Sequence, residues 1–364
     1  MRAIDFYCGG GGLSRGLLDA GIEVVAGFDA DGRCKETYEK NNLPAKFLEQ
    51  DICEVSASAV WKVLGSRRTG DLLIAGCAPC QPFSKHRKCT VDESGTVSPT
   101  RDPDATLLGA FARVVEAMLP GQVLIENVPG IAKVHGFSTY RRFLKMLRAN
   151  SYRIAEGVLD AKRFGVPQTR RRYVLIAVRG RAVSLPEPLF GPGLREYVTV
   201  RQAIAHYPPI KAGERHPFVP NHEAAAISSV NLNRLRSTPH DGGDRRSWPA
   251  ELELACHKGD HDGHTDVYGR MAWDRWAPTL TGRCNSVSNG RYGHPSQDRA
   301  ISLREAASLQ TFGDSYVFCG TRQHIARQIG NAVPVKFGEV LGEHLLRLRS
   351  SKTGQVGVTS RNGI

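Results

Sequence analysis

Short apolar runs alternate with longer amphipathic stretches through the first half of the chain. The runs whose length and content are typical of β-strands lie at residues 3–7, 23–28, 46–49, 72–75, 122–125, 152–159 and 173–178. Apolar residues recur at helical spacing between several of them, at residues 13–18, 105–118 and 138–149. Strands that alternate with helices predict an α/β fold with a doubly wound, mostly parallel sheet.

The pattern changes after residue 186. From there to about residue 298 the periodicity is weak and Gly, Pro and His are frequent, which is typical of a smaller, loop-rich domain. Helical spacing returns at 302–310, where Ser302 and Glu305 have the spacing of a capping box, and at 336–348. We therefore predict a catalytic and cofactor-binding domain at 1–185, a second domain at 186–298, a return to the first at 299–349 and a disordered tail at 350–364.

The charge of the chain narrows the choice of partner. The 364 residues carry a formal net charge of +13, and residues 130–181 contain thirteen Lys or Arg against two acids. Such a strip can be a solvated face, but it also fits a polyanion such as nucleic acid. No run of eighteen apolar residues occurs, so we expect no membrane span. Residues 1–5 are no signal peptide and the nine cysteines are an odd count, so we expect a cytoplasmic protein with reduced thiols.

The loops after the predicted strands carry the candidate chemistry, because ligands bind at the carboxyl ends of strands in open α/β sheets. Residues 9–12 are four glycines, and a glycine loop between a strand and a helix lets backbone approach a nucleotide-like cofactor. Asp29 follows the second strand, where an acid can accept hydrogen bonds from a ribose or cap the next helix. Cys80 follows the fourth strand as a candidate nucleophile, and Glu126 ends the fifth.

Six segments, in this order, resemble the motifs of the cytosine-C5 DNA methyltransferases. They are residues 5–12, with Tyr7 in the place of the family's usual phenylalanine, then 79–81, 126–128, 168–172, 304–310 and 330–334. The similarity covers about residues 2–185 and 295–348. It implies the fold of an S-adenosylmethionine-dependent methyltransferase, a Rossmann-like mixed sheet, with a smaller, loop-rich target recognition domain at 186–298.

The resemblance implies covalent chemistry on a cytosine that is flipped out of double-stranded DNA. The Cys80 thiolate would add to carbon 6 of the ring, which makes carbon 5 nucleophilic towards a methyl group on a sulfonium. Glu126 would share a proton with ring nitrogen N3, and Arg172 would bind the base oxygen. Arg170 would support Glu126 or the loop, and the other positions assigned to catalysis are Asn127, Pro79 and Gln81.

The resemblance also implies S-adenosylmethionine as the cofactor, held by residues from both ends of the chain. Asp29 would bind the ribose and Asp51 the adenine amino group. The other positions that would surround the cofactor are Tyr7, Gly9, Gly11, Gly12, Ile52, Leu107, Asn331 and Val333. A compact chain of this kind suggests a prokaryotic modification enzyme, and we expect a monomer that is paired with a restriction endonuclease.

Three other functions stay open at this point. A tRNA cytosine methyltransferase has similar motifs, although the Cys-Phe-Thr tripeptide of that branch is absent from the chain. A catalytically silent DNA-binding regulator would keep the fold, and an NAD oxidoreductase would keep the glycine loop.

Two groups of cysteine and histidine residues allow other chemistry. Cys77 and Cys80 form a C-x-x-C pair, which a redox centre or half of a zinc site also uses. A second cluster lies in a polar loop and is interpreted as a plain loop or a DNA contact without a metal; it consists of Cys256, His257, His261 and His264.

Overall fold

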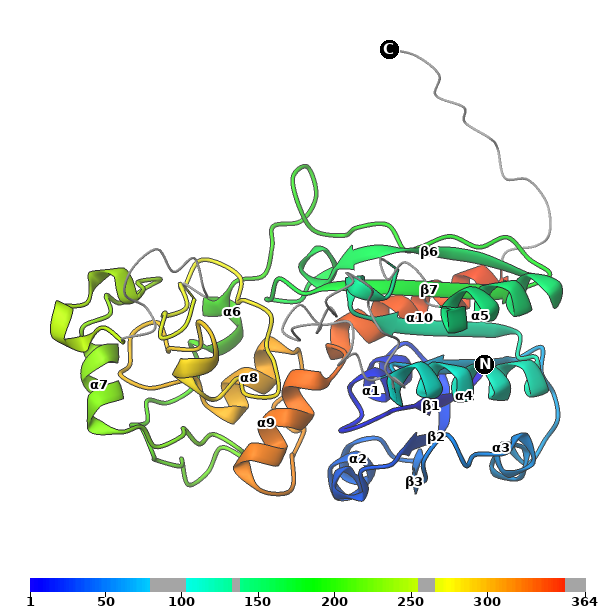
Figure 1. Cartoon of the computed structure of the whole chain (residues 1–364), viewed down its shortest axis with the longest axis horizontal. Coiled ribbons are helices and arrows are strands. Elements are labelled where there is room, and N and C mark those ends of the chain that lie inside the picture. Colours follow the sequence, from blue (N-terminus) through cyan, green and yellow to red (C-terminus); the bar gives the residue numbers. More distant parts are fainter. Residues whose placement is uncertain (79–102, 133–137, 255–265, 351–364) are drawn as a thin grey trace, which may run out of the picture.

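The computed structural model describes residues 1–78, 103–132, 138–254 and 266–350. Its larger lobe contains a seven-stranded sheet in the order β3-β2-β1-β4-β5-β7-β6 (Figure 1). The strands are β1 (Arg2–Phe6), β2 (Glu23–Asp29), β3 (Lys46–Glu49), β4 (Leu72–Gly76), β5 (Gln122–Asn127), β6 (Tyr152–Asp160) and β7 (Arg171–Arg179). Each lies on one of the apolar runs that predicted it.

The α/β prediction is confirmed, and the sheet is mixed. β1 to β5 run parallel to one another, whereas β7 runs antiparallel to both β5 and β6. The chain builds outward from β1 to β3 and then returns to β4 on the other side of β1. The loops after β1 and β4 therefore diverge, which opens a crevice at the carboxyl ends of these strands.

Helices cover both faces of the sheet. They are α1 (Gly12–Asp19), α2 (Lys35–Asn41), α3 (Ala57–Leu64), α4 (Pro103–Met118), α5 (Ser138–Ala149) and α10 (Val335–Ser350). On one face Leu17 of α1 and Phe337 of α10 are fully buried in one hydrophobic cluster. On the other face Phe111 of α4 and Phe143 of α5 are buried in a second cluster. Burial of side chains of this size contributes roughly 1.5–3 kcal/mol each.

The smaller lobe, on the left in Figure 1, consists mostly of loops. Its α-helices are α6 (Val200–Ile204), α7 (Ser229–Arg236), α8 (Leu303–Leu309) and α9 (Arg322–Asn331). Ser302 and Glu305 form the predicted capping box of α8. The fully buried Arg270 donates hydrogen bonds to the carbonyl oxygens of Leu235, Thr238, His294 and Gln297. Its guanidinium thus satisfies loop carbonyls that no strand ladder would satisfy.

The segment after residue 299 divides between the two lobes. Leu309 of α8 and Ile329 of α9 are buried in the same cluster as Ile204 of α6, whereas α10 packs against α1. The predicted domain limits at residues 185 and 298 stay predictions, and residues 351–364 of the predicted tail lie outside the described ranges. No helix within those ranges is long and apolar enough to cross a membrane.

Candidate active site

A cavity of about 710 Å³ lies at the carboxyl ends of β1, β2, β4 and β5, and α9 and residues 330–333 form its far wall. Cavities of this size hold ligands as large as nucleotides. Most of the residues that the sequence assigned to the site line it, namely Tyr7, Gly9, Gly12, Asp29, Asp51, Ile52, Leu107, Glu126, Asn127, Arg170, Arg172, Asn331 and Val333. Pro79, Cys80 and Gln81 lie outside the described residues, as does the Cys256, His257, His261 and His264 cluster.

The glycine loop after β1 has two different faces. The Gly9 amide donates to Asp29 Oδ2 at 2.8 Å, and a Cβ on Gly9 would meet no atom within 4 Å, although its φ of +49° favours glycine. A Cβ on Gly12 would lie 2.4 Å from the carbonyl oxygen of Val333. Gly11 does not line the cavity, because it turns towards Asn42, whose Nδ2 would lie 2.3 Å from an added Cβ. Gly9 therefore faces open space, while Gly11 and Gly12 allow close packing.

Two carboxylates lie on the part of the cavity wall where we expected the ribose and the adenine of the cofactor to bind. Asp29 ends β2, and its Oδ1 accepts from the Asp31 amide at 2.9 Å. Burial raises the pKa of Asp29 above its usual value, while the amides of Asp31 and Gly9 lower it. Asp51 accepts from the Cys53 amide at 2.9 Å and lines the cavity beside the buried Ile52.

The aromatic residue of the first motif is fixed by a hydrogen bond. Tyr7 has a φ of +61°, and its hydroxyl donates to the carbonyl oxygen of Leu107 at 2.8 Å. The contact joins the loop after β1 to α4, and both residues line the cavity. Below the loop, the fully buried Asp5 accepts a hydrogen bond of 2.7 Å from Ser14, and burial raises the pKa of Asp5 to about 7.

An acid and a cation meet at the other end of the cavity. Glu126 lies near the end of β5 and Arg172 near the start of β7, and antiparallel pairing of these strands brings them together. Arg172 Nε lies 3.0 Å from Glu126 Oε1, and both side chains are largely buried. The contact is an ion pair without the alignment of a hydrogen bond, so Oε1 keeps lone pairs for a ligand.

Asn127 connects this pair to the segment that leads to the candidate nucleophile. Its Nδ2 donates to the carbonyl oxygen of Ala78 at 3.2 Å, and its Oδ1 accepts from the Val128 amide at 2.8 Å. Cys77, just before Ala78, also lines the cavity, and burial raises the pKa of its thiol. The end of β4 is thus tied to the end of β5.

Arg170 makes hydrogen bonds that the sequence did not predict. We expected it to support Glu126 or the adjacent loop. Its buried guanidinium donates to the carbonyl oxygens of Leu280 at 2.9 Å, Gly330 at 3.1 Å and Ala332 at 3.0 Å, and support of Glu126 or the loop stays a prediction. Arg170 therefore holds the last motif against the rest of the cavity wall, as a positioning residue.

The cavity also contains residues that sequence reasoning missed. Polar ones come from the end of β1, from the segments after β2 and β3, from the return of the chain after residue 276 and from α9, and they include Asp5, Asp31, Cys34, Gln50, Thr279, Thr281, His324, Arg327 and Gln328. Asp5 lies within the first segment that carried the resemblance, which was the available signal. The others are polar residues without a motif.

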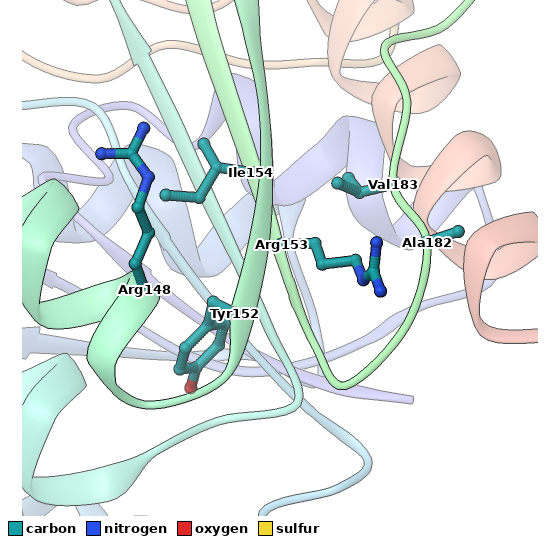
Figure 2. Close-up of a pocket in the computed structure, with 6 residues that line it drawn as sticks. All are labelled: Arg148, Tyr152, Arg153, Ile154, Ala182 and Val183. Atoms are coloured by element: carbon teal, nitrogen blue, oxygen red, sulfur yellow. The ribbon is translucent and has the colours of Figure 1, made fainter.

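A second cavity, of about 380 Å³, lies beside the edge strand β6 and shares no residue with the first (Figure 2). Its lining consists of Arg148, Tyr152, Arg153, Ile154, Ala182 and Val183. These six side chains include no carboxylate, thiol or imidazole, whereas the lining of the first cavity contains all three kinds of group.

The comparisons with known proteins agree on one family. Residues 1–347 match the family described as C-5 cytosine-specific DNA methylase. The Type II methylase M.HgiDII of Herpetosiphon aurantiacus is 38% identical over 350 residues, which cover 94% of each chain. The Type II methyltransferase M1.HphI of Haemophilus parahaemolyticus is 31% identical over 355 residues, 97% of this chain and 88% of that protein.

Solved structures share the fold. A prophage-encoded protein of Escherichia coli superposes with a TM-score of 0.73 at 22% identity, over 96% of this chain and all of the other. The Dnmt2 methyltransferase of S. pombe superposes with a TM-score of 0.58 at 20% identity, over 96% of this chain and 98% of the other. The match to the family over nearly the whole chain leaves no place for the NAD oxidoreductase. The chain belongs to the C-5 cytosine-specific DNA methylases, enzymes that use S-adenosylmethionine to methylate carbon 5 of cytosine in DNA.

Proposed function

We propose that this enzyme methylates one cytosine within a short duplex sequence, through a covalent bond between the Cys80 sulfur and carbon 6 of a flipped-out base. The observation that carries the proposal is the Glu126–Arg172 pair, which lines the same cavity as the predicted cofactor residues. Asn127 adds to it by holding Ala78 beside this pair. Cys80 follows Ala78 by two positions in the sequence.

Each residue of the pair has a separate task in this proposal. Attack of the Cys80 thiolate on carbon 6 moves electron density onto carbon 5, and Glu126 shares a proton with N3 so that the ring accepts the attack. Arg172 donates to the base oxygen while it keeps Glu126 in place. After carbon 5 has taken the methyl group, it loses its proton and the Cys80 sulfur leaves, which restores the aromatic ring.

The lining of the cavity fits S-adenosylmethionine, whose sulfonium supplies an electrophilic methyl group when it is bound. Two hydrogen bonds from backbone amides leave lone pairs on Asp29 for ribose hydroxyls. The open space above Gly9 admits the ligand without a steric conflict. Asp51 and Ile52 would contact the adenine, Tyr7 and Leu107 would form the side of the pocket, and Asn331 and Val333 would close it.

The smaller lobe would read the DNA sequence. Irregular backbone within residues 186–298 presents many polar side chains, and the basic strip at 130–181 would contact phosphates. The names of the relatives quoted above lead us to propose a Type II restriction–modification setting with a partner endonuclease. We further propose that the enzyme acts as a monomer in the cytoplasm, on nucleoid DNA.

The test is transfer of a labelled methyl group from S-adenosylmethionine to unmethylated duplex DNA and, in parallel, to tRNA. We expect label in the duplex alone, within one sequence context that sequencing would identify. Cys80→Ser should abolish the transfer and retain cofactor affinity, whereas Cys53→Ser, which changes an exposed thiol outside the cavity, should transfer normally. Label in tRNA only would favour the RNA enzyme. Wild-type turnover by Cys80→Ser would remove the thiol from the mechanism.

A further inference from the structure

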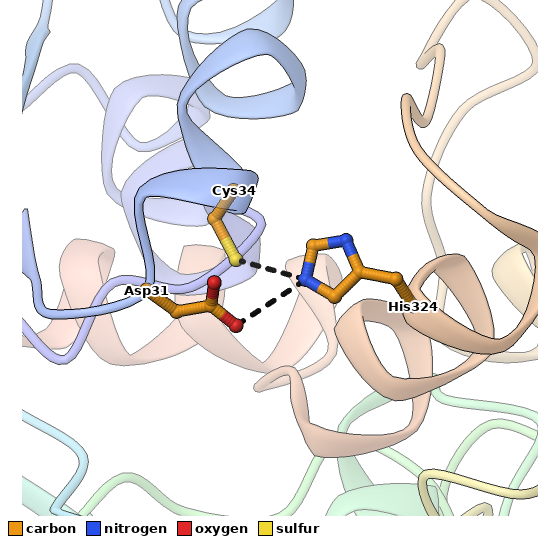
Figure 3. A group of neighbouring side chains, drawn as sticks. All are labelled: Asp31, Cys34 and His324. Carbon is orange, nitrogen blue, oxygen red and sulfur yellow. Dashed lines mark hydrogen bonds and ion pairs between the residues drawn. The ribbon is translucent and has the colours of Figure 1, made fainter.

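Three side chains with metal-binding atoms meet on the wall of the cofactor cavity beyond Asp29. Asp31 and Cys34 follow β2, and His324 comes from the first turn of α9 (Figure 3). One atom of each, the Asp31 carboxylate oxygen, the Cys34 sulfur and a His324 ring nitrogen, lies within 4.8 Å of the other two. The mechanism proposed above uses none of the three.

The contacts converge on a single nitrogen. His324 Nε2 lies 3.4 Å from Asp31 Oδ2 and 3.9 Å from Cys34 Sγ. A Cys–His–Asp relay would need the thiol and the carboxylate on different ring nitrogens, so this group cannot activate Cys34 as a nucleophile in that way. Three ligand atoms of these types this close to one another are instead an arrangement that can hold a metal ion.

The spacing matches tetrahedral coordination. Zinc binds oxygen and nitrogen at about 2.0–2.2 Å and thiolate sulfur at about 2.3 Å, which puts ligand atoms about 3.4–3.6 Å apart at tetrahedral angles. The oxygen–nitrogen separation of 3.4 Å and the sulfur–nitrogen separation of 3.9 Å lie within a few tenths of an ångström of these values, and the oxygen–sulfur separation is no more than 4.8 Å. We propose that Asp31, Cys34 and His324 bind one Zn²⁺ ion, whose remaining coordination position faces the cavity.

Binding requires two proton movements within this group. The Cys34 thiol loses its proton to solvent as the sulfur binds the ion, and the ring proton of His324 moves from Nε2 to Nδ1. Nδ1 now lies 3.0 Å from Gln328 Nε2, and the buried Gln328 Oε1 has no hydrogen-bond partner among the described residues. Rotation of the amide would let Oε1 accept from Nδ1–H, at the cost of the 3.0 Å hydrogen bond that Gln328 Nε2 donates to the Cys319 carbonyl oxygen, and a neighbouring side chain commonly orients a metal-bound histidine in this way.

The surroundings favour a buried rather than an adventitious site. Cys34 and His324 are 5% and 6% exposed, and Asp31 is held by the exposed Arg33, whose Nε and Nη2 lie 2.6 Å and 2.7 Å from its two oxygens. A carboxylate that accepts two such bonds still has lone pairs for an ion. An ion here would join the segment after β2 to α9, the same two parts of the chain that enclose the cofactor.

The test uses Co²⁺ as a spectroscopic substitute for Zn²⁺ on the metal-stripped full-length chain. Thiolate coordination gives a near-ultraviolet charge-transfer band and tetrahedral Co²⁺ gives intense visible bands, and Zn²⁺ should displace both at one ion per chain. Cys34→Ser and His324→Ala should each lose the charge-transfer band. Cys319→Ser, which alters a half-buried thiol that does not line the cavity, should retain it.

Thermal unfolding provides a readout that does not depend on turnover. Zn²⁺ should raise the melting temperature of the wild type and of Cys319→Ser and leave that of Cys34→Ser unchanged, because an ion that binds only the folded state stabilises it. The nearly isosteric serine keeps the fold in which the comparison is made. A wild-type protein without a thiolate band, or a band that persists in Cys34→Ser, would overturn the proposed site.

Discussion

Arg172 Nε lies 3.0 Å from Glu126 Oε1, and the two side chains are 13% and 8% exposed. The pairing of β5 with β7 fixes their backbones on neighbouring strands, so neither side chain has to be ordered by a ligand. A charge pair this deep is stable only while both partners are present, because a single charge left in the cavity wall would be poorly solvated. The pair is thus a preformed acid–cation site at the end of a cofactor cavity.

Glu126→Gln should reduce turnover by about 10²- to 10⁴-fold, since the amide cannot share a proton with the cytosine ring. Cofactor affinity should change little, because Glu126 lies at the end of the cavity away from Asp29 and Asp51. Single-turnover methyl transfer and cofactor titration would separate the two effects. The control is Glu156→Gln, which alters a carboxylate that binds Tyr140 and Tyr173 outside the cavity. A similar loss in both variants would contradict a special role for Glu126.

Arg170→Ala should lower the free energy of unfolding by about 2–4 kcal/mol, because three buried carbonyl oxygens lose a charged donor. It should also weaken cofactor binding, since two of those carbonyls belong to the segment that closes the cavity. Urea unfolding and cofactor titration are the measurements. Arg171→Ala changes the exposed neighbouring arginine and should leave both quantities near wild type. Unchanged stability of Arg170→Ala would show that water molecules donate hydrogen bonds to these carbonyl oxygens as well as the guanidinium does.

Gly12→Ala should damage the cavity through its backbone. The new Cβ would lie 2.4 Å from the Val333 carbonyl oxygen, so either α1 or the 330–333 segment must move. We expect at least a tenfold loss of cofactor affinity and a lower melting temperature. Gly313→Ala, where an added Cβ meets no atom within 4 Å, is the matched control. Normal cofactor affinity in Gly12→Ala would show that α1 and the 330–333 segment can move apart without weakening cofactor binding.

The pKa of Asp5 predicts how stability varies with pH. Burial raises it from 3.8 to about 7, so the folded protein holds this proton more tightly than the unfolded chain does. The stability that Asp5 contributes is therefore complete below about pH 4 and is lost as the pH rises through about 7. The difference of about three pKa units corresponds to at most about 4 kcal/mol.

Asp5→Asn should remove this dependence. The variant should match the wild type near pH 4 and exceed its free energy of unfolding near pH 8, because the amide carries no charge to bury. Urea denaturation of both proteins at the two pH values is the measurement. An equal difference at both values would mean that Asp5 does not titrate in this range.

The strands could be predicted because burial on both faces makes them continuous apolar runs, as in residues 72–75. Their order and direction depend on contacts that no local pattern contains, and the antiparallel β7 is one result. The sequence analysis missed helix α9, and the reason is related. Its buried face includes His324 and Gln328, and the partner of His324, Cys34, belongs to a distant segment.

The site shows the same division. Asp29 and Glu126 could be predicted because acids at the carboxyl ends of parallel strands must meet at one edge of the sheet. The hydrogen bonds of Arg170 could not, since their three acceptors are backbone atoms that carry no side-chain signal. Gly11 was assigned to the cofactor from its motif, but the positive φ of +88° turns it towards Asn42.

The cofactor cavity is walled by residues from opposite ends of the chain, with Gly9 and Gly12 on one side and Asn331 and Val333 on the other. The ribosome synthesises the two glycines at the start of translation and Asn331 and Val333 near its end. No nascent chain can therefore bind the cofactor until residue 333 has left the exit tunnel, however early the sheet forms. We therefore expect a messenger cut short before codon 333 to yield an inert product, and modification of DNA to begin only with chains synthesised through residue 333.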